Sequence, residues 1–371
     1  MQVKQYPFYI KSTVILLGLI LFTFSLINLR DILVPVAFSV IIAILLNPLV
    51  TKFRKHKISP VFSIILAMLI AFVVFSSILY FLSSQIIGFG DNLPLIKSKF
   101  STILHELQEW VQMKFGLTIN KQIKFVNEAM NSSKVLVGET VGTALGTLAV
   151  FFLLPVYIFL LLFYKTLILN FLYEVFSEEN TKQVGEILNQ TKTAIQSYMV
   201  GLLLEALVVA VLNSVALLIL GVDYAILLGV IGAILNMIPY IGGIIAIALP
   251  VLMATITKDG FSTQLGILAA YAIIQFIDNN ILVPRIVSSK VQINALFSII
   301  VVLVGGALWG VAGMFLSIPA VAILKIIFDR IDDLKPWGKL LGDEVPTRHK
   351  GQIWIRRRKN KSVAEEIVEE Q

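Results

Sequence analysis

Polar side chains that could bind a small solute or an ion stand in the apolar stretches of the carboxyl-terminal half. Two are carboxylates and five are amides: Glu205, Asp278, Asn213, Asn236, Gln275, Asn279 and Asn280. An ionisable group at membrane depth costs roughly 2.5–3.5 kcal/mol, so its usual role there is functional. Carboxylate and amide oxygens can hold protons, coordinate cations or hydrogen-bond a polar molecule. The alternative, that these groups only join helix to helix, stays open.

The chain offers little for catalysis. It has no cysteine and only 3 histidines, and its carboxylates show no paired spacing typical of acid–base or metal chemistry. No phosphate-binding loop or dinucleotide fingerprint is present, so the chain alone is not expected to use ATP. We therefore expect no enzyme activity, no cofactor and no bound metal.

Composition indicates the class of protein. Of 371 residues, 57% are hydrophobic and 14% charged, whereas soluble domains carry about 45–50% and 25%. We predict an all-α, polytopic membrane protein with about eight membrane segments, in contact with the lipid bilayer. The net charge of +7 comes from Lys and Arg in loops and the tail. They orient the chain and meet anionic headgroups, so no nucleic-acid partner is expected.

The apolar stretch Gly221–Ile256 contains helix breakers: Pro239, Gly242, Gly243 and Pro250. Irregular backbone at membrane depth is tolerated only where it is buried in protein or lines a cavity. The break, with Asn236 before it and Tyr240 inside it, is therefore the first candidate for a substrate path.

A second broken stretch, Val291–Ile327, ends in a pattern similar to the first. Aligning Pro250 with Pro319 sets Glu205 and Asn213 opposite the Gln275–Asn280 cluster, so the chain is expected to contain two copies of one unit. The expected hinges or breaks of this half are Pro284, Gly305, Gly306, Gly310, Gly313 and Pro319. Arg285, after Pro284, is a further candidate for the path.

Five regions are expected. They are three transmembrane helices in 1–88, an extracytoplasmic amphipathic segment in 89–141, a fourth span and a cytoplasmic amphipathic helix in 142–197, a transport core in 198–328, and a cytoplasmic tail in 329–371. The runs Thr13–Ile27 and Ile32–Val50 are expected to form a helical hairpin. The cytoplasmic amphipathic helix is expected to end before a separate fifth span, 198–220.

The basic loop Lys52–Lys57 is expected in the cytoplasm by the positive-inside rule. Both termini are then cytoplasmic, whether the two broken stretches span the membrane or fold back as re-entrant hairpins. Re-entrant hairpins satisfy the charge rule slightly better, because Arg285 and Lys290 become cytoplasmic, and they give the two units opposite orientations. Small-residue steps such as Gly142 and Gly146 suggest a homo-oligomer.

The motifs resemble those of one family. The chain has Leu46-Asn47-Pro48-Leu49, then Asn236-Met237-Ile238-Pro239-Tyr240-Ile241-Gly242, then Gln275-Phe276-Ile277-Asp278-Asn279 ahead of Pro284. Over about residues 10–340 it is similar to the autoinducer-2 exporter family of bacterial membrane proteins. The resemblance implies a multi-pass inner-membrane permease; some members export that quorum-sensing signal and some are assigned sodium/proton antiport.

The sequence departs from the family's common pattern at three places: Gly243 for Pro, Leu202-Leu203 for Gly-Gln, and Asn294-Ala295 for His-Pro. The last two remove polar groups from the expected path, which bears on autoinducer-2 as the substrate more than on the fold. Three hypotheses follow. The protein exports a small polar molecule by alternating access around broken helices, exchanges Na⁺ or Li⁺ for H⁺ at Glu205 and Asp278, or is a membrane scaffold.

Overall fold

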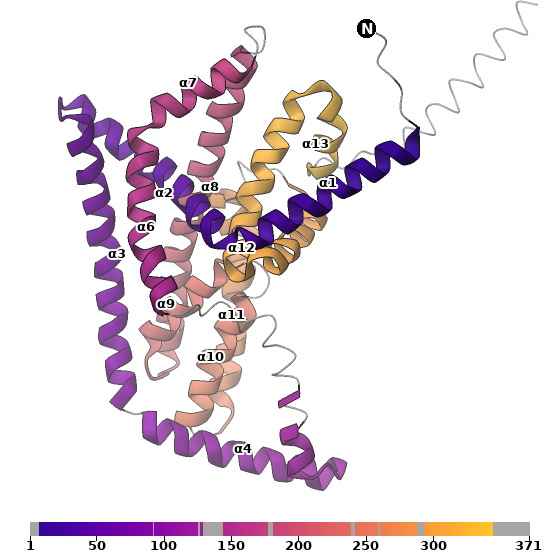
Figure 1. Cartoon of the computed structure of the whole chain (residues 1–371). Coiled ribbons are helices and arrows are strands. Elements are labelled where there is room, and N and C mark those ends of the chain that lie inside the picture. The colour runs from indigo at the N-terminus through magenta and orange to yellow at the C-terminus, as the bar shows by residue number, and fades with distance from the viewer. Residues whose placement is uncertain are drawn as a thin grey trace, which may run out of the picture.

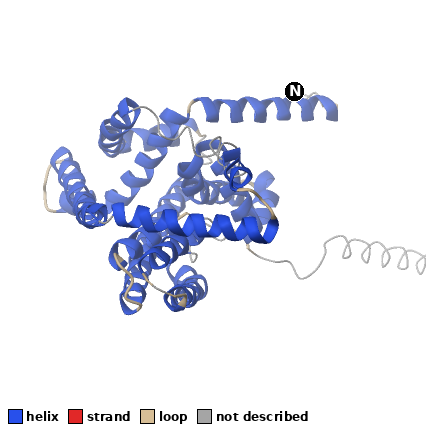
Figure 2. Ribbon diagram, turned by 90° about the horizontal axis from the view of Figure 1, so that it is seen from below, coloured by secondary structure: helices blue, strands red, loops and turns tan. Residues whose placement is uncertain are grey.

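The structure is a computed structural model, and it describes residues 7–91, 93–124, 127–128, 144–176, 181–238, 242–258, 260–287 and 293–343. All regular elements in these ranges are helices (Figure 2). Six described helices are long and apolar enough to cross a membrane, or seven if α6 and α7 form one span. The expected all-α polytopic membrane fold is therefore confirmed.

The amino-terminal helices are α1 (Phe8–Asn28), α2 (Arg30–Lys55) and α3 (Pro60–Asp91). The expected hairpin of the first two is wrong, because α1 leaves its junction with α2 and projects away from the other helices (Figure 1). Its surface is apolar on all sides, so no polar face directs it onto α2. The carboxyl-terminal end of α1 is held by Trp309, whose Nε1 donates to the Leu26 carbonyl at 2.9 Å.

Helix α4 (Leu93–Phe115) follows α3 and lies across one end of the molecule (Figure 1). It is the first of the two amphipathic helices expected between the third and fourth spans. Residues 119–124 of the second are helical, and 129–141 lie outside the described residues. Ile96 of α4 packs on the core cluster that contains residues of α8 to α11, so α4 marks the end of the molecule opposite the basic loop.

Helix α6 (Ala144–Phe163) continues the bundle, and α7 (Lys165–Val175) turns away from it by 63°. α2 and α6 pack through a core cluster that includes Ala43, Val50 and Ile158. No residue of α7 is buried, which fits a helix lying along a surface.

Helix α8 (Thr181–Ile219) is a single helix of 39 residues. The expected end of an amphipathic helix and start of a separate span near residue 198 is therefore wrong. No proline interrupts this stretch, and Gly185 and Gly201 are tolerated inside a helix at a cost of about 1 kcal/mol each. At 1.5 Å per residue α8 is about 58 Å long, so it joins the two ends of the molecule.

Helices α9 (Ala225–Asn236) and α10 (Gly242–Thr257) fold back on one another as hairpin 1. With 12 and 16 residues they are about 18 and 24 Å long, shorter than a hydrocarbon core of about 30 Å. A Cβ at Gly242 would lie 1.7 Å from the Leu235 carbonyl oxygen, so only glycine permits this approach. Pro250 was expected to break the stretch but lies buried inside α10, where the chain continues as a helix.

Helix α11 (Ser262–Ile277) carries the chain back toward the end of the molecule where α8 begins. It continues without a gap as η2 (Asp278–Val287), a π-helix. Pro284, expected as a hinge, lies inside this wider helix. A π-helix of this length is uncommon, and such segments are frequent at functional sites.

Helix α12 (Ala295–Arg330) is interrupted at Trp309 and Gly310, where Gly310 takes φ +61°. A Cβ at Gly313 would lie 1.9 Å from the Gly305 carbonyl oxygen, although eight residues of straight helix would separate them by about 12 Å. α12 is therefore a second helical hairpin, hairpin 2, with its tip at Gly310. Pro319 lies inside its second arm and is not a break.

The two hairpins point in opposite directions. The base of hairpin 1 packs at the end of α8, where Ala225 and Ala254 join Leu217 in one core cluster. The base of hairpin 2 lies at the start of α8, where Arg330 forms an ion pair with Glu186. The two hairpins therefore run in opposite directions along α8.

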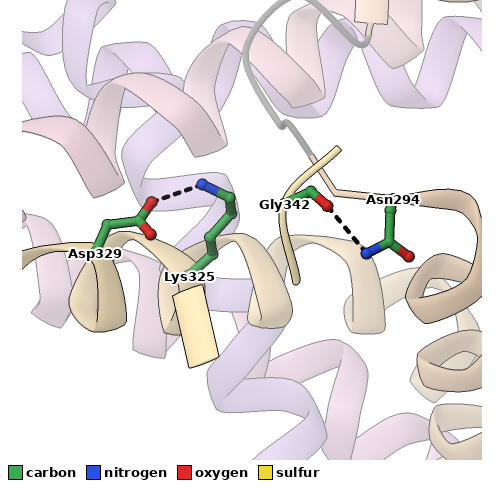
Figure 3. Close-up of polar contacts among 4 residues, drawn as sticks. All are labelled: Asn294, Lys325, Asp329 and Gly342. Carbon is green, nitrogen blue, oxygen red and sulfur yellow. Dashed lines mark hydrogen bonds and ion pairs between the residues drawn. The ribbon is translucent and has the colours of Figure 1, made fainter. Parts of the chain in front are cut away.

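A short carboxyl-terminal segment closes the base of hairpin 2 (Figure 3). Elements η4 (Asp332–Leu334) and α13 (Lys335–Leu341) follow α12. Asn294 caps α12 through Phe297 N, and its Nδ2 donates to the Gly342 carbonyl at 3.0 Å. Lys325 and Asp329 pair at 2.6 Å on the second arm. The hydrogen bond and charge of Lys335 hold the pKa of Asp332 below its usual range.

Candidate functional site

Asn236 and Asp278 meet where the tip of hairpin 1 reaches the α11–η2 junction. Asn236 Nδ2 donates to Asp278 Oδ2 at 3.0 Å, and Gln275 Nε2 makes a longer contact of 3.5 Å with the same oxygen. Asp278 is only 2% exposed. The contact ties the expected break of the first stretch to the most buried carboxylate of the second unit.

Local backbone structure sets these positions. Asn236 is the last residue of α9, so its side chain lies where the chain leaves the helix. Asp278 is the first residue of the π-helix and is buried, while Asn279 and Asn280 after it are exposed. Gly242 and Gly243 open α10 opposite them and leave room for the amide of Asn236.

Glu205 of α8 is the second carboxyl group of the site and is 6% exposed. It is close enough to Asp278 for the charges of the two carboxyl groups to interact. Two carboxyl groups share a hydrogen bond only if one carries a proton. Asp278 Oδ1 receives no hydrogen bond from any donor among the described residues, so a proton between the two acids would satisfy it. The pair can therefore hold and release a proton.

A small polar cavity of about 10 Å³ lies beside this contact. Its polar walls are Asn213, Asn236, Tyr271, Gln275 and Asp278. Gly232, Gly243 and Ala246 of hairpin 1 form much of the remaining wall. The volume is close to the lower limit for one water molecule, so no organic molecule fits in this conformation.

Three oxygens near the cavity lack a hydrogen-bond donor within the described part of the chain: Asn213 Oδ1, the Tyr271 hydroxyl and Asp278 Oδ1. Buried polar atoms are normally paired, and an unpaired one costs about 1–3 kcal/mol. Three of them on one cavity indicate a place made for a solute, an ion or water. No group of three or more His, Asp or Glu side chains at metal-ligand spacing is present in the described ranges.

Tyr271 was missed by the sequence analysis. It stands four and seven residues before Gln275 and Asp278, so all three share one face of α11. That periodicity in an otherwise apolar helix is the signal that could have found it. Its ring is 4% exposed and its hydroxyl turns toward the cavity.

Several expected site residues lie elsewhere. Asn279 and Asn280 are exposed, and Asn280 Nδ2 bonds to the Phe276 carbonyl of its own helix at 2.8 Å. Arg285 is exposed near the end of η2. The glycines of hairpin 2, Gly305, Gly306, Gly310 and Gly313, form its tip or its arm contacts and do not line the polar cavity. Pro239 and Tyr240 lie outside the described residues.

The departures from the family pattern have structural counterparts. Leu202, in place of the usual Gly, is buried in the core cluster of α2, α8 and α12, while Leu203 is exposed. Asn294, in place of the usual His, caps hairpin 2 at its base and does not face the cavity.

Comparison with known proteins identifies the family of the chain. The family described as AI-2E family transporter matches residues 13–333. The chain belongs to the AI-2E transporter family. It is 26% identical over 335 residues to the AI-2 transport protein TqsA of Escherichia coli strain K12, which covers 89% of this chain and 95% of TqsA. It is 25% identical over 313 residues to the putative transport protein YrrI of Bacillus subtilis strain 168, covering 81% and 86%.

A third relative, the putative transport protein YhhT of Escherichia coli strain K12, is 24% identical over 322 residues, covering 85% of this chain and 89% of the relative. The AI-2E family match and these names make the chain a membrane transporter of a bacterial, multi-pass family. Its spanning helices contact the bilayer, and as a transporter it acts on a small-molecule solute.

Proposed function

We propose that this AI-2E family transporter carries a small polar solute across the bacterial inner membrane by alternating access, with the solute site at the cavity beside Asp278. The observation that supports this most is the set of unpaired buried oxygens at Asn213, Tyr271 and Asp278. A scaffold that used these groups only to join helices would pair them with one another.

The site must enlarge to admit an organic solute, because its present volume is about 10 Å³. Hairpin 1 is the element suited to that movement. It holds the cavity wall at Gly232, Gly243 and Ala246, and its tip is tied to α11–η2 through Asn236 and Asp278. When a polar group of the solute replaces the Asn236 amide as the hydrogen-bond partner of Asp278, the tip of hairpin 1 is free to move and Asp278 stays hydrogen-bonded.

Autoinducer-2 is the first solute to test, because TqsA is named an AI-2 transport protein. Its hydroxyl groups could donate to the unpaired oxygens of the site. The absence of the family's usual Gln and His, where Leu203 and Asn294 stand, predicts a different preference among small polar molecules.

Exchange of Na⁺ or Li⁺ for H⁺ is a second candidate. Two features favour it: the cavity has the size of one water molecule or ion, and the carboxyl groups of Glu205 and Asp278 are close enough to interact. Oxygen ligands without donors suit a small cation, and its binding would displace the shared proton. Under this candidate the two acids exchange cation and proton in turn.

One experiment separates the candidates. The full chain and its Asp278→Asn and Glu205→Gln variants are reconstituted in vesicles that hold a pH dye, and labelled autoinducer-2 efflux and Na⁺-dependent proton movement are both measured. Organic solute transport predicts efflux by the wild type that falls in Asp278→Asn. Cation exchange predicts Na⁺-dependent proton movement that both substitutions abolish. If the wild type does neither, both candidates fail and the scaffold hypothesis gains.

We further propose that both termini and the basic loop lie in the cytoplasm. Hairpin 1 then re-enters the membrane from outside and hairpin 2 from inside. We also propose that the protein works as a homo-oligomer. The positive-inside rule supports the first two parts, because Arg54 and Lys165 lie at the end where hairpin 2 has its base. The exposed apolar helix surfaces are compatible with self-association as well as with lipid.

A further inference from the structure

Three cations from three helices gather near the α6–α7 bend. Arg54 is in the last turn of α2, Lys165 is the first residue of α7, and Lys192 is on α8. Arg54 and Lys192 are close enough to Lys165 for their charges to repel it. None of the three forms an ion pair with a carboxylate in the ranges that the structure describes. Like charges at this spacing repel one another, and a bound anion would relieve the repulsion.

A buried amide orients one of these cations. Lys165 Nζ donates to Asn47 Oδ1 at 3.0 Å, and Asn47 is 9% exposed. Asn47 and Arg54 are two helical turns apart on α2, which puts them on the same side of that helix. The ammonium of Lys165 is therefore held toward Arg54, with donors left for an acceptor oxygen.

An apolar groove of about 260 Å³ adjoins the cations. Its wall consists of Val36, Tyr157, Leu160, Leu161, Tyr164 and Ile168. Tyr164 immediately precedes Lys165, so one end of the groove lies at the cationic cluster. Val36 lies about three turns before Asn47 on the same side of α2, so the groove continues toward the middle of the bundle. The atoms that face the groove are apolar, so it suits hydrocarbon better than a polar solute.

Aromatic rings near the α6–α7 bend indicate that the three cations lie at the level of the membrane surface. Phe159 stacks on Phe163 at 5.8 Å, and Phe163 meets Tyr164 edge to face at 5.0 Å, just before the 63° bend into the surface helix α7. Tyrosine, as at Tyr164, is enriched at the headgroup level of membranes. The cations thus stand where phosphates lie, and the groove where acyl chains lie.

We propose that Arg54, Lys165 and Lys192 bind the phosphate of an anionic phospholipid, one acyl chain of which lies in the groove along α6. The charge of the cluster and the apolar wall select this occupant over a free anion or a second copy of the chain. The site is separate from the polar cavity at Asp278 and does not depend on the proposed solute.

The test uses the full chain in detergent micelles, with binding followed by native mass spectrometry during titration with phosphatidylglycerol, phosphatidylcholine or inorganic phosphate. Phosphatidylglycerol is expected to bind more tightly than phosphatidylcholine. Arg54→Gln and Lys192→Gln should each weaken it about fivefold, the effect of one charge near a membrane surface. Lys182→Gln, an exposed cation on the same helix as Lys192, is the matched control and should bind as the wild type does.

A groove variant distinguishes the sources of phosphate. Leu160→Trp fills the groove at an exposed position and should weaken phosphatidylglycerol while leaving all charges in place. Equal binding of phosphatidylglycerol and phosphatidylcholine would overturn the proposal. A second contrary result is competition by inorganic phosphate at equal concentration together with no effect of Leu160→Trp, which would identify a site for a free anion. A third is cross-linking of two chains through the groove that excludes lipid.

Discussion

Asn236 Nδ2 lies 3.0 Å from Asp278 Oδ2, so a single hydrogen bond joins the tip of hairpin 1 to the first residue of the π-helix. The two residues are 42 positions apart in the chain and belong to the two units that the sequence suggested. The Asn236 amide belongs to the tip of a hairpin, whereas the buried Asp278 carboxylate needs a hydrogen-bond partner at all times because an unpaired buried charge is costly. This relationship is the basis for the proposed movement of hairpin 1.

Replacing Asn236 by Ala should disable transport more than it disturbs folding. The substitution leaves Asp278 Oδ2 with only the long contact from Gln275, at a cost of about 1–3 kcal/mol. We expect at least a tenfold lower rate of solute or cation movement in vesicles. Asn280→Ala, an exposed amide bonded to its own helix, is the matched control and should transport normally. Equal rates for the two variants would contradict a role for Asn236.

Hairpin 2 should depend on the glycine contact between its arms. A Cβ at Gly313 meets the backbone of Gly305 at 1.9 Å, so Gly313→Ala forces the arms apart. Overpacking of this kind costs about 1–3 kcal/mol or more. We expect a lower midpoint of thermal unfolding in detergent. Gly18→Ala, where a Cβ has nothing within 4 Å, should unfold like the wild type, and a stable Gly313→Ala protein would argue against the hairpin.

The proposed orientation predicts which sides of the membrane a cysteine reagent reaches. The chain has no cysteine, so a single introduced one is the only target. Lys258→Cys, at the base of hairpin 1, should react with an impermeant maleimide added outside intact cells. Arg285→Cys should react only after the cells are opened. The reverse pattern would mean that the two broken stretches cross the membrane.

Asn294 should stabilise the base of hairpin 2 (Figure 3). Its side chain caps α12 and donates to the carbonyls of Leu340 and Gly342 at 2.8 and 3.0 Å. Loss of an N-cap costs about 0.5–2 kcal/mol, and the two further hydrogen bonds add to this. Asn294→Ala should therefore lower the unfolding midpoint and expose the chain after Leu341 to protease. Asn294→Asp keeps the cap and should recover part of the loss.

Much of the fold could be predicted from hydropathy and breakers, and the misses have physical causes. Gly242 and Gly310 mark the hairpin tips because close backbone approach or positive φ requires glycine. Pro250 and Pro319 carry the same signal as breakers but lie inside helices, since each removes only one backbone hydrogen bond. The continuity of α8 through residue 198 could not be predicted, because a change from mixed to apolar composition does not end a helix.

The candidate site was predictable in part. Buried acids and amides in apolar stretches pointed to Glu205, Asn213, Asn236 and Asp278. Asn279 and Asn280 have the same composition signal, but one and two positions after Asp278 they leave the helix face that Asp278 shares with Tyr271 and Gln275. Tyr271 was hidden because a tyrosine in an apolar helix is ordinary, and only its spacing from Gln275 and Asp278 sets it apart.

Access to Ala246 tests the central claim most directly, since this residue lines the polar cavity. In oriented vesicles, Ala246→Cys should react with an impermeant thiol reagent added to either side, and transported solute should slow the reaction. Ala254→Cys, fully buried in the core of the same hairpin, should stay unlabelled. Labelling of Ala246→Cys that never exceeds that of Ala254→Cys from either side would contradict alternating access at this cavity.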